Sequence, residues 1–294
     1  MHAISPSLRW IATGIFLLFG AFSAPNGNFQ LLVFALVMVT VGIPHGAVDH
    51  LLASSTTASP WKFYLRYLGI MAAYTLLWVL APLLALFLFL FVSAYHFGQM
   101  HLETQAQGLV QKITYSSIGF GFLGLIVFGD WQASAALLSS FFTLPDLFPY
   151  RNWIGVGSML LLIPLYAHYP KNPRIWLAIS ALAISLWVLP LYLSFALYFG
   201  FWHSLPSLKI EYIGLKAKGN VGDYTNFIRN LLPFSLLSLL GIGILLVAGM
   251  RYLEPNQLML LFFILVSLIT APHVLVMDTY IEKEFKAKRG RFVA

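Results

Sequence analysis

The chain has 294 residues, of which 60% are hydrophobic and only 9% charged, with a net charge of +7 and no cysteine. A soluble domain carries about 25% charged residues, so this chain has too little polar surface to coat a water-soluble globule, and lipid must surround much of it. The lack of cysteine excludes disulfides and thiolate metal sites. We interpret the positive charge as membrane orientation rather than nucleic-acid binding, because the basic residues lie in short loops between apolar runs.

Ten apolar runs predict a single all-α integral membrane domain covering residues 1–294, a polytopic transmembrane helical bundle. A bilayer-spanning helix needs about 20 mostly apolar residues. The predicted spans are residues 8–23, 29–53, 62–81, 83–101, 110–128, 153–168, 174–189, 191–207, 230–250 and 257–277. The run 131–142 is too short to cross comfortably and precedes two prolines, so we expect it to be re-entrant or interfacial.

The distribution of positive charge predicts the orientation of this bundle. With ten spans and the N-terminus inside, all of the 17 Lys and Arg residues except Arg151 and Arg251 fall on the inner side. Counting 131–142 as a full span would spoil this asymmetry. The excess of cationic residues on one side is typical of cytoplasmic loops, so the charges predict that both termini are cytoplasmic.

Five of the eight histidines lie near the ends of four spans, whereas His2 and His168 have unremarkable positions. They are His45 and His50 in span 29–53, His96 in 83–101, His203 in 191–207 and His273 in 257–277. These four spans are all even-numbered and run in the same direction under the predicted topology. The five histidines are therefore expected in the cytoplasmic half of the bilayer, at similar depth.

A single histidine near a helix end more often caps carbonyls or reaches toward the interface than binds a ligand. Four spans that each deliver a histidine at one depth favour a shared site, since ionisable groups inside membranes are costly and usually functional. Neutral imidazole suits Zn, Cu, Fe and Ni. The sequence therefore predicts a metal held by histidines, with open positions for O₂ or water.

Asp49 lies one turn after His45 and is a candidate partner for a ligating imidazole. A carboxylate that accepts the second ring N–H fixes the tautomer of a metal ligand. The recipient could be His45 or a histidine from another helix, or Asp49 could simply bond a hydroxyl or cap a helix. His45 and His50 point about 140° apart on an ideal helix, so both could face one ion only if residues 44–46 are distorted.

Aromatic side chains concentrate beside the histidine motifs. Most of the chain's aromatic residues are expected to serve packing and lipid contact, but some could wall a pocket for a flat, apolar polyene that enters from lipid. The candidates for such a pocket are Tyr95, Phe97, Tyr198, Phe199, Phe201 and Trp202.

At these motifs the sequence resembles the Brp/Blh family of bacterial and archaeal β-carotene 15,15′-dioxygenases. The matching segments are residues 44–50 (PHGAVDH), 95–98 (YHFG), 201–204 (FWHS) and 272–273 (PH). Some members carry a second histidine four residues after the position of His203. This chain has Ser207 there, which places more weight on His273 and on the pair His45 and His50.

The resemblance implies a multi-pass protein of a bacterial or archaeal cell (inner) membrane with a non-haem Fe(II) site held by histidines. It also implies that the enzyme uses O₂ to cleave the central double bond of β-carotene, taken from lipid, into two molecules of retinal, which a rhodopsin could receive. Two other functions remain open from the residues alone. A proton or metal-ion transporter is disfavoured because the outer halves of the histidine-bearing spans have almost no ionisable groups. A haem-binding electron carrier would need histidines paired across two helices.

Overall fold

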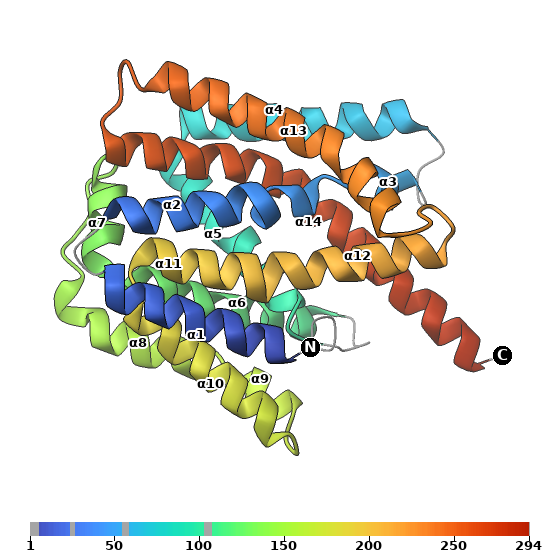
Figure 1. Ribbon diagram of the computed structural model, residues 1–294, viewed down its shortest axis with the longest axis horizontal. Helices are drawn as coiled ribbons and strands as arrows, with labels where there is room; N and C mark the ends of the chain where they lie inside the picture. The colour runs from blue at the N-terminus through green and yellow to red at the C-terminus, as the bar shows by residue number, and fades with distance from the viewer. Residues whose placement is uncertain (1–5, 24–26, 55–58, 103–107, 294) are drawn as a thin grey trace.

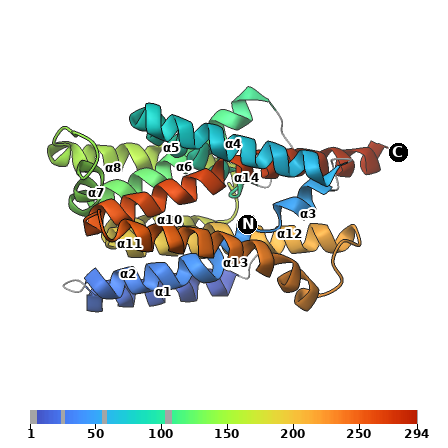
Figure 2. The ribbon, with the colours of Figure 1, turned by 90° about the horizontal axis from the view of Figure 1, so that it is seen from above.

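The computed structural model describes residues 6–23, 27–54, 59–102 and 108–293, and within these ranges all regular structure is helical. His2 lies outside them. The helices run side by side along the long axis of the molecule (Figures 1 and 2). The expected all-α class is confirmed.

The elements follow the apolar runs of the sequence, with short irregular turns between some of the helices. The α-helices are α1 (Pro6–Ser23), α2 (Gly27–Val37), α3 (Asp49–Ser54), α4 (Pro60–Leu80), α5 (Pro82–Gln99), α6 (Leu109–Gly129), α7 (Trp131–Ser139), α8 (Arg151–Leu160), α9 (Ile163–His168), α10 (Pro173–Val188), α11 (Leu191–Ala196), α12 (Leu205–Ala217), α13 (Tyr224–Gly249) and α14 (Pro255–Val293). The other segments are the π-helices η1 (Met38–Gly42) and η4 (Leu197–Ser204), and the 3₁₀-helices η2 (Pro44–Gly46) and η3 (Phe148–Tyr150).

Six helical segments within the described residues are long and apolar enough to cross a bilayer. They are Gly27–Ala53, Pro60–Leu80, Pro82–Gln99, Leu109–Gly129, Tyr224–Gly249 and Pro255–Lys283. Two shorter apolar helices, Ser7–Phe22 and Pro173–Val188, match two more predicted spans. The chain therefore has the make-up of a multi-pass membrane protein, and the count of ten spans stays a prediction.

Two predicted spans differ from the helices observed. The run 153–168 is divided, because α8 ends at Leu160 and α9 begins at Ile163, next to Pro164. Proline has no backbone N–H and fixes its own φ, so it favours a new helix start at this place. The run 191–207 continues without a break into α12, as far as Ala217. The run 131–142 forms the nine-residue α7, whose N-terminus is capped by the Asp130 carboxylate.

The orientation predicted from the charges is open to a direct test. Figure 1 places α3 and α12 toward the end of the bundle from which the C-terminal part of α14 projects, and α7 at the opposite end. A reporter fused after Ala294 should be active only in the form that signals a cytoplasmic position, and one inserted between α7 and α8 should signal the periplasm. The reverse pattern would contradict the predicted topology.

Helices α5 and α6 approach closely because glycine lies on both sides of their contact. A Cβ atom added at Gly119 would lie 1.7 Å from the carbonyl oxygen of Ala94, and one added at Gly98 would lie 1.8 Å from that of Tyr115. Backbone atoms at such distances cannot move aside without a shift of a whole helix. Small residues at helix contacts are typical of membrane bundles, and this contact positions the end of α5 that carries His96.

We expect Gly119→Ala to destabilise the folded protein by about 1–3 kcal/mol, as for other overpacked contacts. The matched control is Gly69→Ala in the middle of α4, where an added Cβ has no atom within 4 Å. Thermal unfolding in the same detergent should show a lower midpoint for Gly119→Ala alone. Equal midpoints for the two variants would show that the α5–α6 contact tolerates the methyl group.

Candidate metal centre

Three irregular turns carry or precede the histidines that face the interior. The π-helix η1 and the 3₁₀-helix η2 replace a regular helix around His45, and the eight-residue π-helix η4 contains His203. A π-turn inserts an extra residue and rotates everything after it around the helix axis, and such turns occur frequently at functional sites. These turns change which side chains point inward at His45 and His203, whereas His96 and His273 lie in the regular helices α5 and α14.

Four histidines from four separate segments meet in the core of the bundle. Ring centroids lie 4.8 Å apart for His45 and His273, 4.7 Å for His96 and His203, 5.1 Å for His96 and His273, and 5.3 Å for His45 and His203. Ligand atoms of His45, His96 and His273 all lie within 4.8 Å of one another. All four side chains are at least 93% buried, and His203 is fully buried. We call these four residues the histidine cluster.

The hydrogen bonds of two members decide which ring nitrogen remains available. His45 Nδ1 donates to the carbonyl oxygen of Gly42, and His273 Nδ1 donates to Asp49 Oδ1 over 2.8 Å. Because a carbonyl and a carboxylate only accept, each ring carries its proton on Nδ1. The lone pair on Nε2 of both histidines is therefore free to bind a metal.

Five ring nitrogens of the histidine cluster have no hydrogen-bond partner in the protein. Both ring nitrogens of His96 and of His203, and Nε2 of His273, are buried without a hydrogen bond. Leaving a buried polar atom unpaired costs about 1–3 kcal/mol, so several together need an explanation such as an ion. The donor set is made of neutral imidazoles, which suit Fe, Zn, Cu or Ni, and it fits a transition metal on these grounds.

Asp49 is itself held by a hydroxyl from another helix. Its Oδ2 accepts from the hydroxyl of Tyr67 over 3.2 Å, while Oδ1 accepts from His273. Asp49 and His273 are 224 residues apart in the chain. The sequence left open whether Asp49 would bond His45, a histidine from another helix, a hydroxyl or a helix end. In the structure it bonds a histidine from another helix, His273, and a hydroxyl, that of Tyr67. Tyr67 has no motif around it that would have identified it.

His50 lies outside the cluster. Residues 44–46 are distorted into a 3₁₀ turn, yet the ring of His50 packs against Phe234 on α13, with centroids 4.5 Å apart. It lines a separate groove between α4 and α13. The structure thus brings together four of the five histidines named from the sequence and separates the fifth.

A cavity of about 140 Å³ adjoins the cluster, and apolar side chains line most of it. All four histidines face it, and two of the six predicted pocket aromatics, Phe97 and Phe199, line it. The cavity wall also contains aromatic residues that the sequence did not single out, and they are Trp78, Phe89, Phe195 and Phe263. Several of these lie a turn or more from any histidine in sequence, so proximity to a motif could not find them.

The other four predicted pocket residues have different surroundings. Tyr95 hydrogen-bonds Asp278, and Phe201 packs edge-on against Phe16. Trp202 lies beneath the guanidinium of Arg9.

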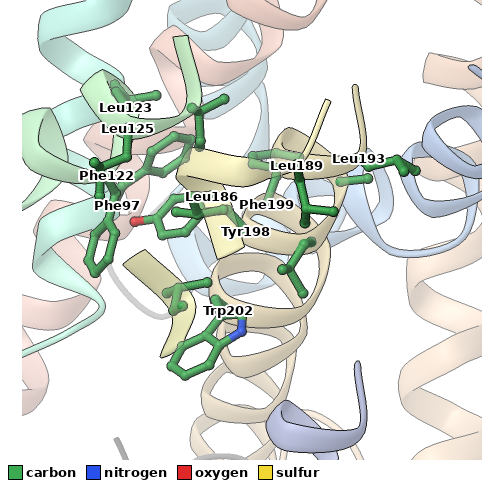
Figure 3. Packing of buried hydrophobic residues seen from close by; sticks show 14 of the residues in the cluster. Phe97, Phe122, Leu123, Leu125, Leu186, Leu189, Leu193, Tyr198, Phe199 and Trp202 are labelled. Carbon is green, nitrogen blue, oxygen red and sulfur yellow. The ribbon is translucent and has the colours of Figure 1, made fainter. Parts of the chain in front are cut away.

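Tyr198 is fully buried and hydrogen-bonds His101 Nε2 over 3.0 Å. Figure 3 shows it in the packed core near Phe97, Phe122 and Leu186. This packing supports the η4 segment that carries His203 and leaves Tyr198 away from the cavity.

The chain is similar to known proteins over most of its length. The family described as "Beta-carotene 15,15'-dioxygenase" matches residues 36–280, a range that includes all four histidines of the cluster. A relative from an uncultured marine bacterium, 66A03, named "Beta-carotene 15,15'-dioxygenase", is 24% identical over 257 residues, which cover 82% of this chain and 90% of the relative. No solved structure matches the chain.

Proposed function

We propose that this chain, which belongs to the beta-carotene 15,15′-dioxygenase family, cleaves the central double bond of β-carotene or a related carotenoid at the histidine cluster. Membership in this family makes the chain a carotenoid-cleaving oxidoreductase. The name of its relative supports β-carotene as the substrate. The observation that carries the proposal is the meeting of four buried histidines beside an apolar cavity. O₂ is the second substrate, retinal the product, and the inner membrane of a bacterial or archaeal cell the location.

The cofactor of this proposal is Fe(II), with His45 and His273 as Nε2 ligands and with His96 and His203 completing the set. Iron is supported by the family's oxygenase chemistry and by the all-imidazole donors. When bound, it supplies the activation of O₂ that the spin-paired polyene alone cannot provide. Five buried nitrogens of three of these rings have no partner in the protein, and a single ion would satisfy one nitrogen of each ring.

The chain's own residues then position the groups and exclude water. The carbonyl of Gly42 orients His45, and the carboxylate of Asp49 orients His273, each through Nδ1. Phe97 and Phe199 pack against His203, with centroids 4.6 and 5.5 Å away, and both line the cavity. Flat apolar walls suit a conjugated chain and leave few partners for water.

The function is tested by incubating purified protein, loaded with Fe(II), with β-carotene in air and identifying the products by mass. We expect retinal as the sole cleavage product, and none under argon or without iron. The metal content should be iron, with no Soret absorption band. Two apocarotenals of unequal length, or retinal formation independent of metal, would contradict the proposal, and a Soret band would favour haem.

A further inference from the structure

A groove with a volume of about 560 Å³ lies between α4 and α13, with α14 as its floor. Tyr64, Tyr67 and Leu68 line it from α4, and Leu237 and Gly241 line it from α13. Leu237 and Leu68 are 64% and 61% exposed, so the groove is open toward the lipid that surrounds these helices. Figure 1 shows α4 and α13 along the same border of the bundle.

The groove and the cavity lie on different faces of α14. Val266, Thr270 and His273 line the cavity, whereas Leu265, Leu268 and Ile269 line the groove. Residues spaced three and four apart share one face of a helix, so these two sets point in different directions. The histidine cluster lies where the two spaces come closest, since the segment that carries His45 continues through Gly46 and Ala47 into the wall of the groove.

A small pocket of about 20 Å³, which we call the passage, lies beside the cluster and shares wall residues with both spaces. Its walls include His45, Phe199 and His273, which also line the cavity, together with Ile43, Gly46 and Ile269, which also line the groove. A Cβ atom added at Gly46 would lie 3.4 Å from His273 Nδ1. A methyl group at Gly46 would thus be in ordinary van der Waals contact with the ring of His273 at the wall of the passage.

A substrate cut at its central bond needs room on both sides of the metal, because equal halves extend from that bond in opposite directions. Pockets that hold small molecules have volumes of about 300–1,000 Å³, and the cavity of about 140 Å³ is too small to take a whole carotenoid. The groove supplies the missing volume, and its opening to lipid provides an entry for an apolar molecule. This step depends on the function proposed above.

We propose that the carotenoid binds across the passage, with one half in the cavity, the other half in the groove between α4 and α13, and the central double bond beside His45 and His273. The groove is then the second half of the substrate site and the side from which the polyene enters from the bilayer. With its two halves in the two spaces, the substrate has its central bond at the cluster, and cleavage there gives equal products.

Two glycines on α13 offer a matched test. Neither Gly241 nor Gly243 has an atom within 4 Å of an added Cβ, but Gly241 lines the groove and Gly243 is absent from its walls. We expect Gly241→Trp to lower kcat/KM for β-carotene about tenfold or more, the equivalent of about 1.4 kcal/mol of lost contact. Gly243→Trp should match the parent protein, and the iron content of both should be unchanged.

The second readout is the amount of β-carotene that the metal-free protein retains in detergent, measured by its visible absorption. Gly241→Trp should retain less than Gly243→Trp. A second pair, Leu237→Trp in the groove and Leu236→Trp on the neighbouring lipid-facing surface, gives the same comparison without a glycine change. Equal kcat/KM and equal retention within each pair would show that the groove contacts only lipid.

These outcomes also separate the groove from the function itself. If the parent protein forms no retinal, the proposed activity fails, and retention by the metal-free variants still decides whether the groove holds the carotenoid. If the parent forms retinal and the members of each pair agree, the activity stands and the groove proposal is wrong.

Discussion

Replacing His203 with alanine should remove the bound metal and abolish carotenoid cleavage while the protein remains folded. The side chain is fully buried, its ring lies 4.7 Å from that of His96, and neither nitrogen has a protein partner. Losing a residue that hydrogen-bonds a metal ligand lowers metal affinity roughly 10–100-fold, and losing the ligand itself should lower it further. We therefore expect a fall of more than about 100-fold in metal affinity, with turnover below detection.

Thermal unfolding with and without metal distinguishes this role from a structural one. A ligand that binds only the folded state raises its stability, so Fe(II) should raise the unfolding midpoint of the parent protein and leave that of His203→Ala unchanged. The metal-free midpoints of the two should be close, because the alanine variant also loses two unsatisfied buried nitrogens. The matched control is His50→Ala, which should keep full iron content because His50 packs on Phe234 outside the cluster. Full iron and turnover in His203→Ala would exclude His203 from the ligand set.

Asp49→Asn should weaken metal binding roughly 10–100-fold without unfolding the bundle. Asp49 accepts one hydrogen bond from His273 Nδ1 and another from the Tyr67 hydroxyl. An asparagine offers one acceptor oxygen, so its amide N–H₂ must face one of these two donors, and the negative charge that supports the ligating imidazole is lost. The affinity is measured by competition with a chelator, and the turnover by retinal formation.

Two companion variants locate the cause of this effect. Tyr67→Phe removes only the hydroxyl that holds Asp49, so we expect a smaller loss of metal affinity than for Asp49→Asn. Asp278→Asn is the control, since that carboxylate bonds Tyr95 and Gln99 rather than a histidine of the cluster. Parental affinity in Asp49→Asn would show that Asp49 serves only the Tyr67 hydroxyl.

The amino-acid sequence by itself determined the class of the protein and the identity of its motifs. A charged fraction of 9% leaves no alternative to lipid as the main solvent, and apolar runs near the thickness of a bilayer determine where most helices lie. The four segments that supply the histidine cluster were recognisable for the same reason, because imidazoles are rare and costly inside such runs. The family was recognisable from the same motifs, and the family match over residues 36–280 confirms that interpretation.

Only the tertiary structure decided how these residues meet. Sequence spacing predicts which side chains share a face of a regular helix, but the π- and 3₁₀-turns at η1, η2 and η4 break that period around His45 and His203. The sequence therefore could not decide which of His45 and His50 belongs to the cluster. The bond between Asp49 and His273 joins residues 224 positions apart, and the hydroxyl of Tyr67 and the passage beside Gly46 also arise from packing between helices. Such contacts depend on the distance and angle between packed helices. The sequence of any single helix does not specify these.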